Sequence, residues 1–337
     1  MSIKKEIIIF EVAPNKIPPE LANIPNINAS NIIKIASSNN RCIILMNDGT
    51  LYEWGVFKDW PRDQKTKAPT LKNVTDIAMS LYNSFALLND GTVVWWGVTN
   101  TNINSLANYQ DAFKILTDIK TIAVSRDIIC VVTNDGKLKG FGAYNLTSYP
   151  TDLPPVKSVS IAGLTTIVIL NDNTIRILGD DTINSNLGFN KNPPSLNNVI
   201  AIAGNETQII GLKNNNTAYI WGEGGSSVTP YIKNISAGYN FVTMVNFKET
   251  SKINIEKNNG DILSLSSRTP TLIASGNHVI AVRNYIEEPV KSSNISLYIG
   301  IGVSVLCTLS IIIIIIFVIK SKNKSKNKID YNDSDNN

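Results

Sequence analysis

The order of apolar and polar positions repeats along the chain. Each copy has a short run rich in Ile, Val and Ala, a polar interruption, a second apolar run, a polar turn and a third run that ends in glycine. These runs are short, bounded by turn residues and free of helical periodicity, so each copy is predicted to form a small antiparallel β-sheet. Five copies have the same length without gaps: Ile35–Gly55, Ile77–Gly97, Ile122–Gly142, Val159–Gly179 and Ile202–Gly222.

The turn between the second and third runs has the chemistry of a tight hairpin. A type I′ turn needs positive φ, which glycine adopts without strain, and Asn is the next most tolerant residue. Asn173 and Asn216 stand where glycine is missing, which supports a real backbone constraint at this position. The other three copies carry Asp-Gly: Asp48–Gly49, Asp90–Gly91 and Asp135–Gly136.

The repeat length separates the possible architectures. Successive closing glycines from Gly55 to Gly222 are 42, 45, 37 and 43 residues apart. Periods of this size indicate a propeller or a solenoid. Since each copy reads as a set of hairpins, the array is predicted to be a β-propeller.

The two ends of the array suggest how a ring could close. A sixth, irregular copy begins at Ile235, and a half copy that lacks its hairpin and third strand begins at Leu272. The β-rich segment Glu6–Val12 belongs to no copy. We expect it to complete the last blade, because closure removes exposed strand edges. The prediction is an all-β propeller of seven blades, with six or eight as the alternatives.

The repeat resembles that of the regulator-of-chromosome-condensation family. The likeness lies in Ile-Ala near the start of a copy, Asp-Gly in its middle and Trp-Gly at the end of its third strand, and it covers residues 6–285. The resemblance implies a regulator-of-chromosome-condensation-like β-propeller that serves mainly to bind other proteins. The closing pairs are Trp54–Gly55, Trp96–Gly97, Phe141–Gly142 and Trp221–Gly222.

The array also departs from the pattern of that family. The His that usually precedes the second strand survives only in the half copy, as His278, and the Gly-Gln-Leu-Gly segment after Trp-Gly is absent. The array is therefore a divergent one. The residues in the place of the His are Arg41, Asn83, Ile128, Thr165, Gln208 and Phe241.

Charge and composition exclude several classes of function. The formal net charge is +4, from 31 basic and 27 acidic residues, and part of the excess lies in residues 320–337. A near-neutral body argues against binding nucleic acid. One His and three cysteines without CxxC spacing argue against a metal site or a disulfide framework. We therefore expect no catalytic residue, no metal and no cofactor.

The C-terminal part carries a membrane signal. Residues 297–319 are uncharged and strongly apolar, and a Lys-rich run follows from Lys320. A stretch of this length predicts a single-pass transmembrane helix that contacts membrane lipid. The expected organisation is a propeller over residues 1–288, a linker over 289–296, the helix over 297–319 and a polar tail over 320–337.

The sequence leaves open on which side of the membrane the propeller lies. The N-terminus does not read as a signal peptide, because its apolar run Ile7–Phe10 is short and is flanked by Glu6 and Glu11. This favours a C-terminally anchored protein with its propeller in the cytosol. The positive-inside rule, applied to the Lys-rich tail, favours the opposite orientation.

The best candidate for a binding residue set lies in the loop after the first Trp-Gly. Phe57, Trp60 and Arg62 combine aromatic area with a guanidinium, and Trp and Arg are enriched in interface hot spots. The alternative is that Trp60 covers the propeller edge. The adjacent carboxylates Asp180 and Asp181, which follow the closing Gly179 of the fourth copy, are predicted to form a solvated turn.

These observations predict a membrane-anchored platform for protein–protein interaction that is not an enzyme. Its protein partner is not identified by the sequence. One alternative is a guanine-nucleotide exchange factor for a small GTPase, with Phe247–Lys257 as its wedge. A second alternative is an exported receptor or inhibitor with the propeller outside the cytosol.

Overall fold

In a computed structural model the chain divides into two compact units, Ser2–Ile286 and Met1 with Glu287–Asn337. Residues 287–337 lie outside the part of the chain that the structure describes. The structure describes residues 3–12, 16–56, 68–99, 101, 104–142, 149–179, 188–189, 196–223, 225–238, 241–247, 252–257, 262–266, 270–275 and 278–286.

The structure confirms a mostly β fold built from small antiparallel sheets. Within the described residues the strands form seven sheets, numbered here in chain order. The first is β2 (Ile32–Ser38), β3 (Arg41–Met46) and β4 (Leu51–Gly55). The second is β5 (Val74–Met79), β6 (Asn83–Leu88) and β7 (Val93–Gly97). The third is β8 (Ile119–Val124), β9 (Ile128–Thr133) and β10 (Leu138–Gly142).

The later sheets follow the same plan with additional outer strands. The fourth is β11 (Val156–Ala162), β12 (Thr165–Leu170) and β13 (Ile175–Leu178). The fifth is β14 (Val199–Gly204), β15 (Gln208–Lys213), β16 (Ala218–Gly222) and β17 (Ser227–Thr229). The sixth is β18 (Ile232–Ala237), β19 (Phe241–Asn246), β20 (Lys252–Lys257) and β21 (Ile262–Ser266). The seventh is β22 (Pro270–Ser275), β23 (Val279–Ile286) and β1 (Ile3–Phe10).

Helical structure is confined to connections. The helices are α1 (Pro19–Ala22) and α2 (Gln110–Lys114), with 3-10 turns at Ala29–Asn31 and Ser105–Tyr109. Among the described residues no helix is both long and apolar enough to cross a bilayer. The expected linker (289–296), membrane helix (297–319) and tail (320–337) lie outside the described residues.

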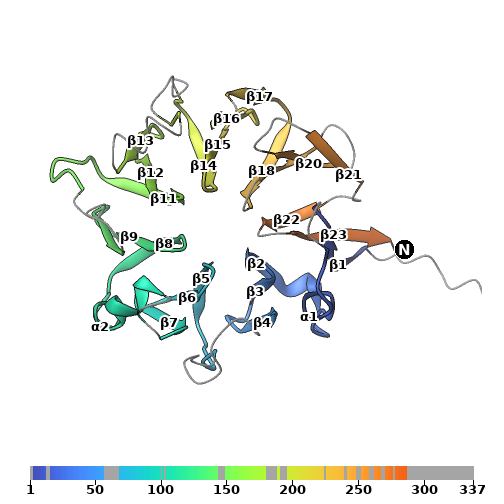
Figure 1. The fold of residues 1–337 in the computed structure, drawn as a ribbon, viewed down its shortest axis with the longest axis horizontal. Coiled ribbons are helices and arrows are strands. Elements are labelled where there is room, and N and C mark those ends of the chain that lie inside the picture. Colours follow the sequence, from blue (N-terminus) through green and yellow to red (C-terminus); the bar gives the residue numbers. More distant parts are fainter. Residues whose placement is uncertain are drawn as a thin grey trace, which may run out of the picture. The chain divides into compact units, whose positions relative to one another are not determined.

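The sheets of this unit are arranged around a central axis (Figure 1). The first strand of each sheet is innermost and packs against the first strand of the next. The series of contacts runs from β2 through β5, β8, β11, β14, β18 and β22, and β22 contacts β2 again. The inner strands therefore form a closed circle.

The two chain regions that meet at the closure are far apart in the sequence. β1 pairs antiparallel with β23 over its whole length, from Ile3 opposite Ile286 to Phe10 opposite Val279. The Arg283 guanidinium also forms an ion pair of 2.6 Å with Glu6. The N-terminal strand thus supplies the third strand of the seventh sheet.

The hairpins between second and third strands adopt the expected backbone. Gly49 has a φ of +78°, and a Cβ at that position would lie 2.8 Å from the backbone nitrogen of Asn73 in the next sheet. Asn173 and Asn216 have φ values of 63° and 62°. The prediction that Asn replaces glycine in the left-handed region is therefore confirmed.

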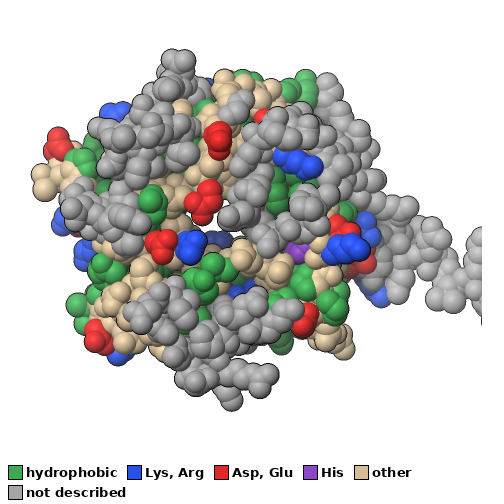
Figure 2. Space-filling view, in the orientation of Figure 1, with side chains coloured by type: hydrophobic (Ala, Val, Ile, Leu, Met, Phe, Trp, Pro, Cys, Tyr) green, Lys and Arg blue, Asp and Glu red, His purple; other side chains and the backbone are tan. Residues whose placement is uncertain are grey.

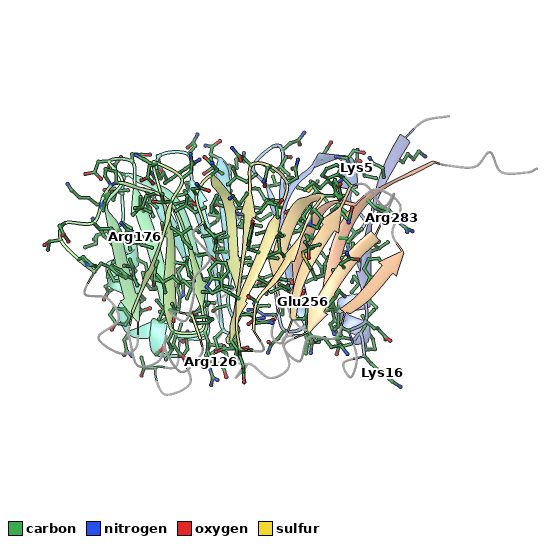
Figure 3. The ribbon with its side chains drawn as sticks, turned by 90° about the horizontal axis from the view of Figure 1, so that it is seen from above. Lys5, Lys16, Arg126, Arg176, Glu256 and Arg283 are labelled. Carbon is green, nitrogen blue, oxygen red and sulfur yellow. The ribbon has the colours of Figure 1, made fainter. Side chains whose placement is uncertain are left out.

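Hydrogen bonds join the hairpins of the second to fifth sheets to the sheet that follows each of them. The N–H of Ile119 donates to the Gly91 carbonyl at 3.0 Å, and the N–H of Ile232 donates to the Asn216 carbonyl at 2.8 Å. We call the end of the ring that carries these turns the hairpin rim. The other end, which carries the turns between first and second strands, is the opposite rim. Figure 3 shows both ends in profile, with Lys5 toward the hairpin rim and Arg126 on the opposite rim.

Candidate binding surface and the network beneath it

The predicted binding residues Phe57, Trp60 and Arg62 lie outside the described residues. The root of their loop is described and lies on the opposite rim. Val56 follows β4, is buried, and donates its N–H to the Asn40 carbonyl at 2.9 Å. Gly55 precedes it with a φ of +120°, and a Cβ there would lie 2.2 Å from the same Asn40 oxygen. The closing glycine is thus required by the close approach of the turn before β3.

A buried ion pair lies directly beneath this loop root. Arg41 opens β3 and Glu53 is on the paired strand β4, and their side chains are 2.8 Å apart. Only 3% and 6% of the two side chains is exposed. Burial lowers the pKa of the Arg41 guanidinium to about 10, while the charge of Glu53 acts in the opposite direction. Arg41 is therefore charged at neutral pH, and the fold needs the pairing with Glu53 because an unpaired buried charge is strongly destabilising.

The same ion pair joins the first sheet to the second. Ser84 Oγ donates to Glu53 Oε1 at 2.8 Å, and Trp96 Nε1 donates to Glu53 Oε2 at 2.8 Å. Arg41 Nη2 donates to the carbonyl of Ser80 at 2.9 Å. We call Arg41, Glu53, Ser84 and Trp96 the Glu53 network. It fixes the β4 end, from which the predicted binding loop starts, to the neighbouring sheet.

The second sheet has a related polar lock. Asn83 occupies the position that Arg41 holds in the first sheet, and it is fully buried. Its Oδ1 accepts from Trp95 Nε1 at 2.9 Å and from Asn104 Nδ2 at 2.7 Å. Asn104 lies in the connection after β7, so the lock holds the start of that connection against the sheet. Of the adjacent pair Trp95 and Trp96, Trp96 is buried and Trp95 is half-buried.

A third lock joins the third and fourth sheets. The Tyr149 hydroxyl lies 2.9 Å from Cys130 Sγ and 3.0 Å from Thr166 Oγ1. Burial raises the pKa of the Tyr149 phenol and also raises the pKa of the Cys130 thiol. A buried thiol with a raised pKa is a poor nucleophile. Cys130 therefore packs against Tyr149 and helps to position its hydroxyl.

The remaining histidine joins the seventh sheet to the first. His278 is buried, and its Nε2 lies 3.1 Å from Asn40 Oδ1 in the turn before β3. Burial lowers the pKa of His278, and the charge of Glu11 partly opposes this effect. The position before or at the start of the second strand thus carries an inter-sheet contact at Arg41 and His278, and at Asn83 a contact to the connection that follows the sheet.

The aspartates of the repeat signature lie at the hairpin rim and stabilise their own turns. Asp48 Oδ1 accepts from the Thr50 backbone N–H at 3.0 Å and from its hydroxyl at 2.7 Å. These bonds lower the pKa of Asp48, and the Thr92 bonds lower that of Asp90 in the same way. The hydrogen bonds of Thr133 and Lys137 lower the pKa of Asp135 to about 2. These residues are structural.

A cavity of about 270 Å³ lies on the axis. It opens at the centre of the face shown in Figure 2. Small and aliphatic side chains of six inner strands line it, including Ala36, Ala123, Ser160, Ala203 and Ser236. Since none of its lining residues is charged, the cavity offers no anchor for an ionic ligand.

The region considered as an exchange wedge is only partly a loop. Within Phe247–Lys257, Lys252–Lys257 forms β20, which pairs with β19 from Asn246 opposite Lys252 to Phe241 opposite Lys257. Residues 248–251 lie outside the described residues. Asp180 and Asp181 also lie outside them.

Sequence reasoning missed the Glu53 network. Its partners come from two sheets, so no single repeat contains them. One signal was present, because Arg41 opens a strand whose other residues, Cys42–Met46, are all apolar. A cation at the start of such a strand requires a buried partner.

Solved structures show which fold this is. Prp20p from Saccharomyces cerevisiae matches with a TM-score of 0.59 at 14% identity, over 86% of this chain and 93% of that protein. Human WBSCR16 matches with a TM-score of 0.56 at 14% identity, over 75% and 86% of the two chains. The CRINKLY ectodomain of the Arabidopsis thaliana receptor kinase ACR4 matches with a TM-score of 0.53 at 14% identity, over 70% and 83%.

Sequence comparison gives no closer assignment. No protein-family model matches the chain, and no curated protein matches it. At 14% identity the structural matches establish the fold alone. The chain has the fold of RCC1-like β-propellers.

Proposed function

We propose that this protein is a membrane-anchored β-propeller of seven blades that serves as a platform for protein–protein interaction. The seven sheets are its blades, and β1 closes the ring. Binding of a partner requires a fixed surface and no catalytic group. The platform presents the loops that start from the opposite rim, and the candidate binding residues remain Phe57, Trp60 and Arg62, which follow Val56 in the sequence.

The observation that carries this proposal is the Glu53 network. A buried ion pair and two further hydrogen bonds fix the β4 end to the second sheet. A loop that starts from so rigid a base loses less conformational entropy when it binds. Rigid support beneath a binding surface is therefore expected of a recognition module.

Structural relatives support a binding role. The structural study of Prp20p describes its binding properties to Gsp1p and histones, and Kap60 has been crystallised bound to yeast RCC1. Those partners belong to those proteins. For this chain they support the proposal of a propeller that binds a protein.

The anchor is the uncharged segment 297–319, followed by the Lys-rich tail. We propose that the propeller lies on the cytosolic side of that membrane. Confinement to a membrane raises the effective concentration of the platform toward partners at the same surface.

A site-specific photo-cross-linking experiment tests the platform. A photoreactive amino acid at Trp60 in the full chain, expressed in membranes, should give one discrete adduct. The Arg62→Ala change should abolish that adduct and leave the melting temperature unchanged. The same photoreactive group at Glu223, which is exposed on the opposite rim, is the matched control and should give none. Equal labelling from both positions would overturn the predicted surface.

A further inference from the structure

Six of the seven large hydrophobic side chains that the described residues expose lie toward the hairpin rim, and the seventh, Ile115, follows α2 in the connection before β8. Ile33 and Ile200 are the second residues of inner strands that begin at the hairpin rim, and each sits at a β-bulge. Tyr52 follows the first hairpin, and Val228 on β17 lies opposite Tyr219 near the fifth hairpin. The exposed fractions are Ile33 51%, Tyr52 41%, Ile115 78%, Ile200 49%, Val228 59%, Tyr231 42% and Phe247 47%.

Tyr231 and Phe247 form an exposed aromatic pair at the sixth sheet. Their ring centroids are 5.9 Å apart in an edge-to-face arrangement, and the Phe247 N–H donates to the Tyr231 carbonyl at 3.0 Å. Tyr231 has a φ of +66°. A bulky residue in the left-handed region is strained, so packing alone does not account for its presence there.

Five other sheets place Asn at the position of Phe247, and Asn, Asp or Pro at the position of Tyr231. The same N–H to carbonyl bond recurs in all five of them, and its donor is Asn each time. The sixth sheet is thus the one among these six that has aromatic rings at these two positions. The equivalent pairs are Asn47–Asn31, Asn89–Asn73, Asn134–Asp118, Asn171–Pro155 and Asn214–Asn198.

Lysines lie on β15 and on β18, two strands of neighbouring sheets that contact each other. Lys233 is exposed two residues after Tyr231, and Lys213 lies 5.6 Å from the Tyr219 ring centroid. The first four hairpins carry aspartates, whereas the fifth carries only Asn214–Asn216 and the sixth begins with Phe247. We call Lys213, Val228, Tyr231, Lys233 and Phe247 the rim patch. It is apolar and cationic, with no carboxylate among its own residues.

The described chain leaves the ring at the same rim. β23 ends at Ile286, and residues 287–296 separate this point from the uncharged segment that begins at residue 297. Ten extended residues reach at most about 35 Å. β23 has eight residues, so the ring is about 26 Å deep along it. If the opposite rim faced the bilayer, the chain would have to return along the depth of the ring, which takes up most of the maximum reach of residues 287–296.

We propose that the rim patch docks on the anionic headgroups of the bilayer in which the chain is anchored. This inference rests on the anchorage proposed above. Tyr and Phe side chains partition into the membrane interface, and Lys side chains bind anionic lipid there. The opposite rim then faces away from the membrane and is open to a protein partner.

The test uses the full chain reconstituted in phosphatidylcholine vesicles with and without phosphatidylserine. A fluorophore is placed on Val228→Cys, and a matched control on Glu206→Cys at the opposite rim, both with Cys307→Ser. Lipids that carry a headgroup quencher should quench the Val228 probe and spare the Glu206 probe. The quenching should fall when phosphatidylserine is omitted or when salt screens the lysines.

A matched variant separates docking from folding. Tyr231→Asn with Phe247→Asn installs the residues that other sheets carry, so the ring should keep its melting temperature and the Val228 probe should lose its quenching. Equal quenching at both rims, or none at Val228, in protein that stays with the vesicles after alkaline washing would overturn the docking alone. Protein released by the alkaline wash would overturn the anchorage and this inference with it.

Discussion

Trp96 and Glu53 lie on neighbouring sheets and are joined by a 2.8 Å hydrogen bond from the indole Nε1 to the carboxylate Oε2. The Trp of a Trp-Gly closing pair thus satisfies a buried charge in the preceding sheet. The corresponding Trp221 does not repeat this contact, because its Nε1 has no hydrogen-bond partner within the described residues. The first and second sheets are therefore held together by a polar contact that the fifth sheet lacks.

Removal of the Glu53 charge should destabilise the ring strongly. Glu53→Gln keeps the size of the side chain and leaves the Arg41 guanidinium buried without a counter-ion. Breaking one side of a buried pair costs about 3–5 kcal/mol. Urea unfolding of the full chain in detergent, followed by Trp fluorescence, should show this loss.

Two further variants calibrate that result. Exposed Glu223→Gln removes a carboxylate from the opposite rim and should change stability by less than about 0.5 kcal/mol. Arg41→Met combined with Glu53→Leu should be more stable than Glu53→Gln, since apolar replacement of a whole pair is well tolerated. A loss in Glu53→Gln no larger than that of the control would show that the pair is not coupled to folding.

The hairpins could be predicted from the sequence, and the contacts between sheets could not. The turn type at Asp48–Gly49 follows from these two residues alone, because the residue type decides whether a positive φ is favourable. Glu53 becomes a link between sheets only in the folded ring, where Trp96 of the next copy lies beside it. The aromatic pair Tyr231 and Phe247 is similar, because its two positions are neighbours only after strand pairing.

The closing glycine of the first sheet should not tolerate a side chain. In Gly55→Ala the new Cβ would lie 2.2 Å from the Asn40 carbonyl, at a φ of +120°. Left-handed backbone alone costs a non-glycine residue about 1–2 kcal/mol, and the close contact adds to it. A fall in the urea midpoint should follow.

Asn216→Gly provides the opposite comparison at a hairpin. Asn216 has a φ of 62°, which glycine adopts without strain. Its urea midpoint should stay within error of the wild type. Similar losses in Gly55→Ala and Asn216→Gly would show that backbone conformation is not what selects these residues.

Acidification should weaken the closure through His278. Its pKa is lowered in the fold by burial, whereas an unfolded chain has an ordinary His pKa of about 6.5. The unfolded state therefore binds more protons below that value, and stability falls as the pH drops through it toward the folded pKa. The loss should show in urea midpoints measured stepwise from neutral pH downward.

His278→Gln identifies the group responsible. Gln retains a donor toward Asn40 and does not titrate, so the variant should have a flatter stability profile in the same pH interval. Carboxylates ordinarily titrate at lower pH and are the same in both proteins, so they contribute equally to both profiles. Parallel profiles for the two proteins would show that His278 is not the group that responds.

Deletion of residues 1–11 should open the ring. It removes β1, which pairs with β23 over eight residues. It also removes Ile7 and Ile9, which pack against the cluster containing Leu21 and Ile280. The freed edge of β23 would then be open to pairing with a second chain. Size-exclusion chromatography in detergent should show oligomers, and protease should cleave the variant sooner.

Deletion of residues 1–2 alone spares the paired strand and should leave both measurements unchanged. A monodisperse, protease-resistant variant without residues 1–11 would show that the ring holds together through its inner strands alone.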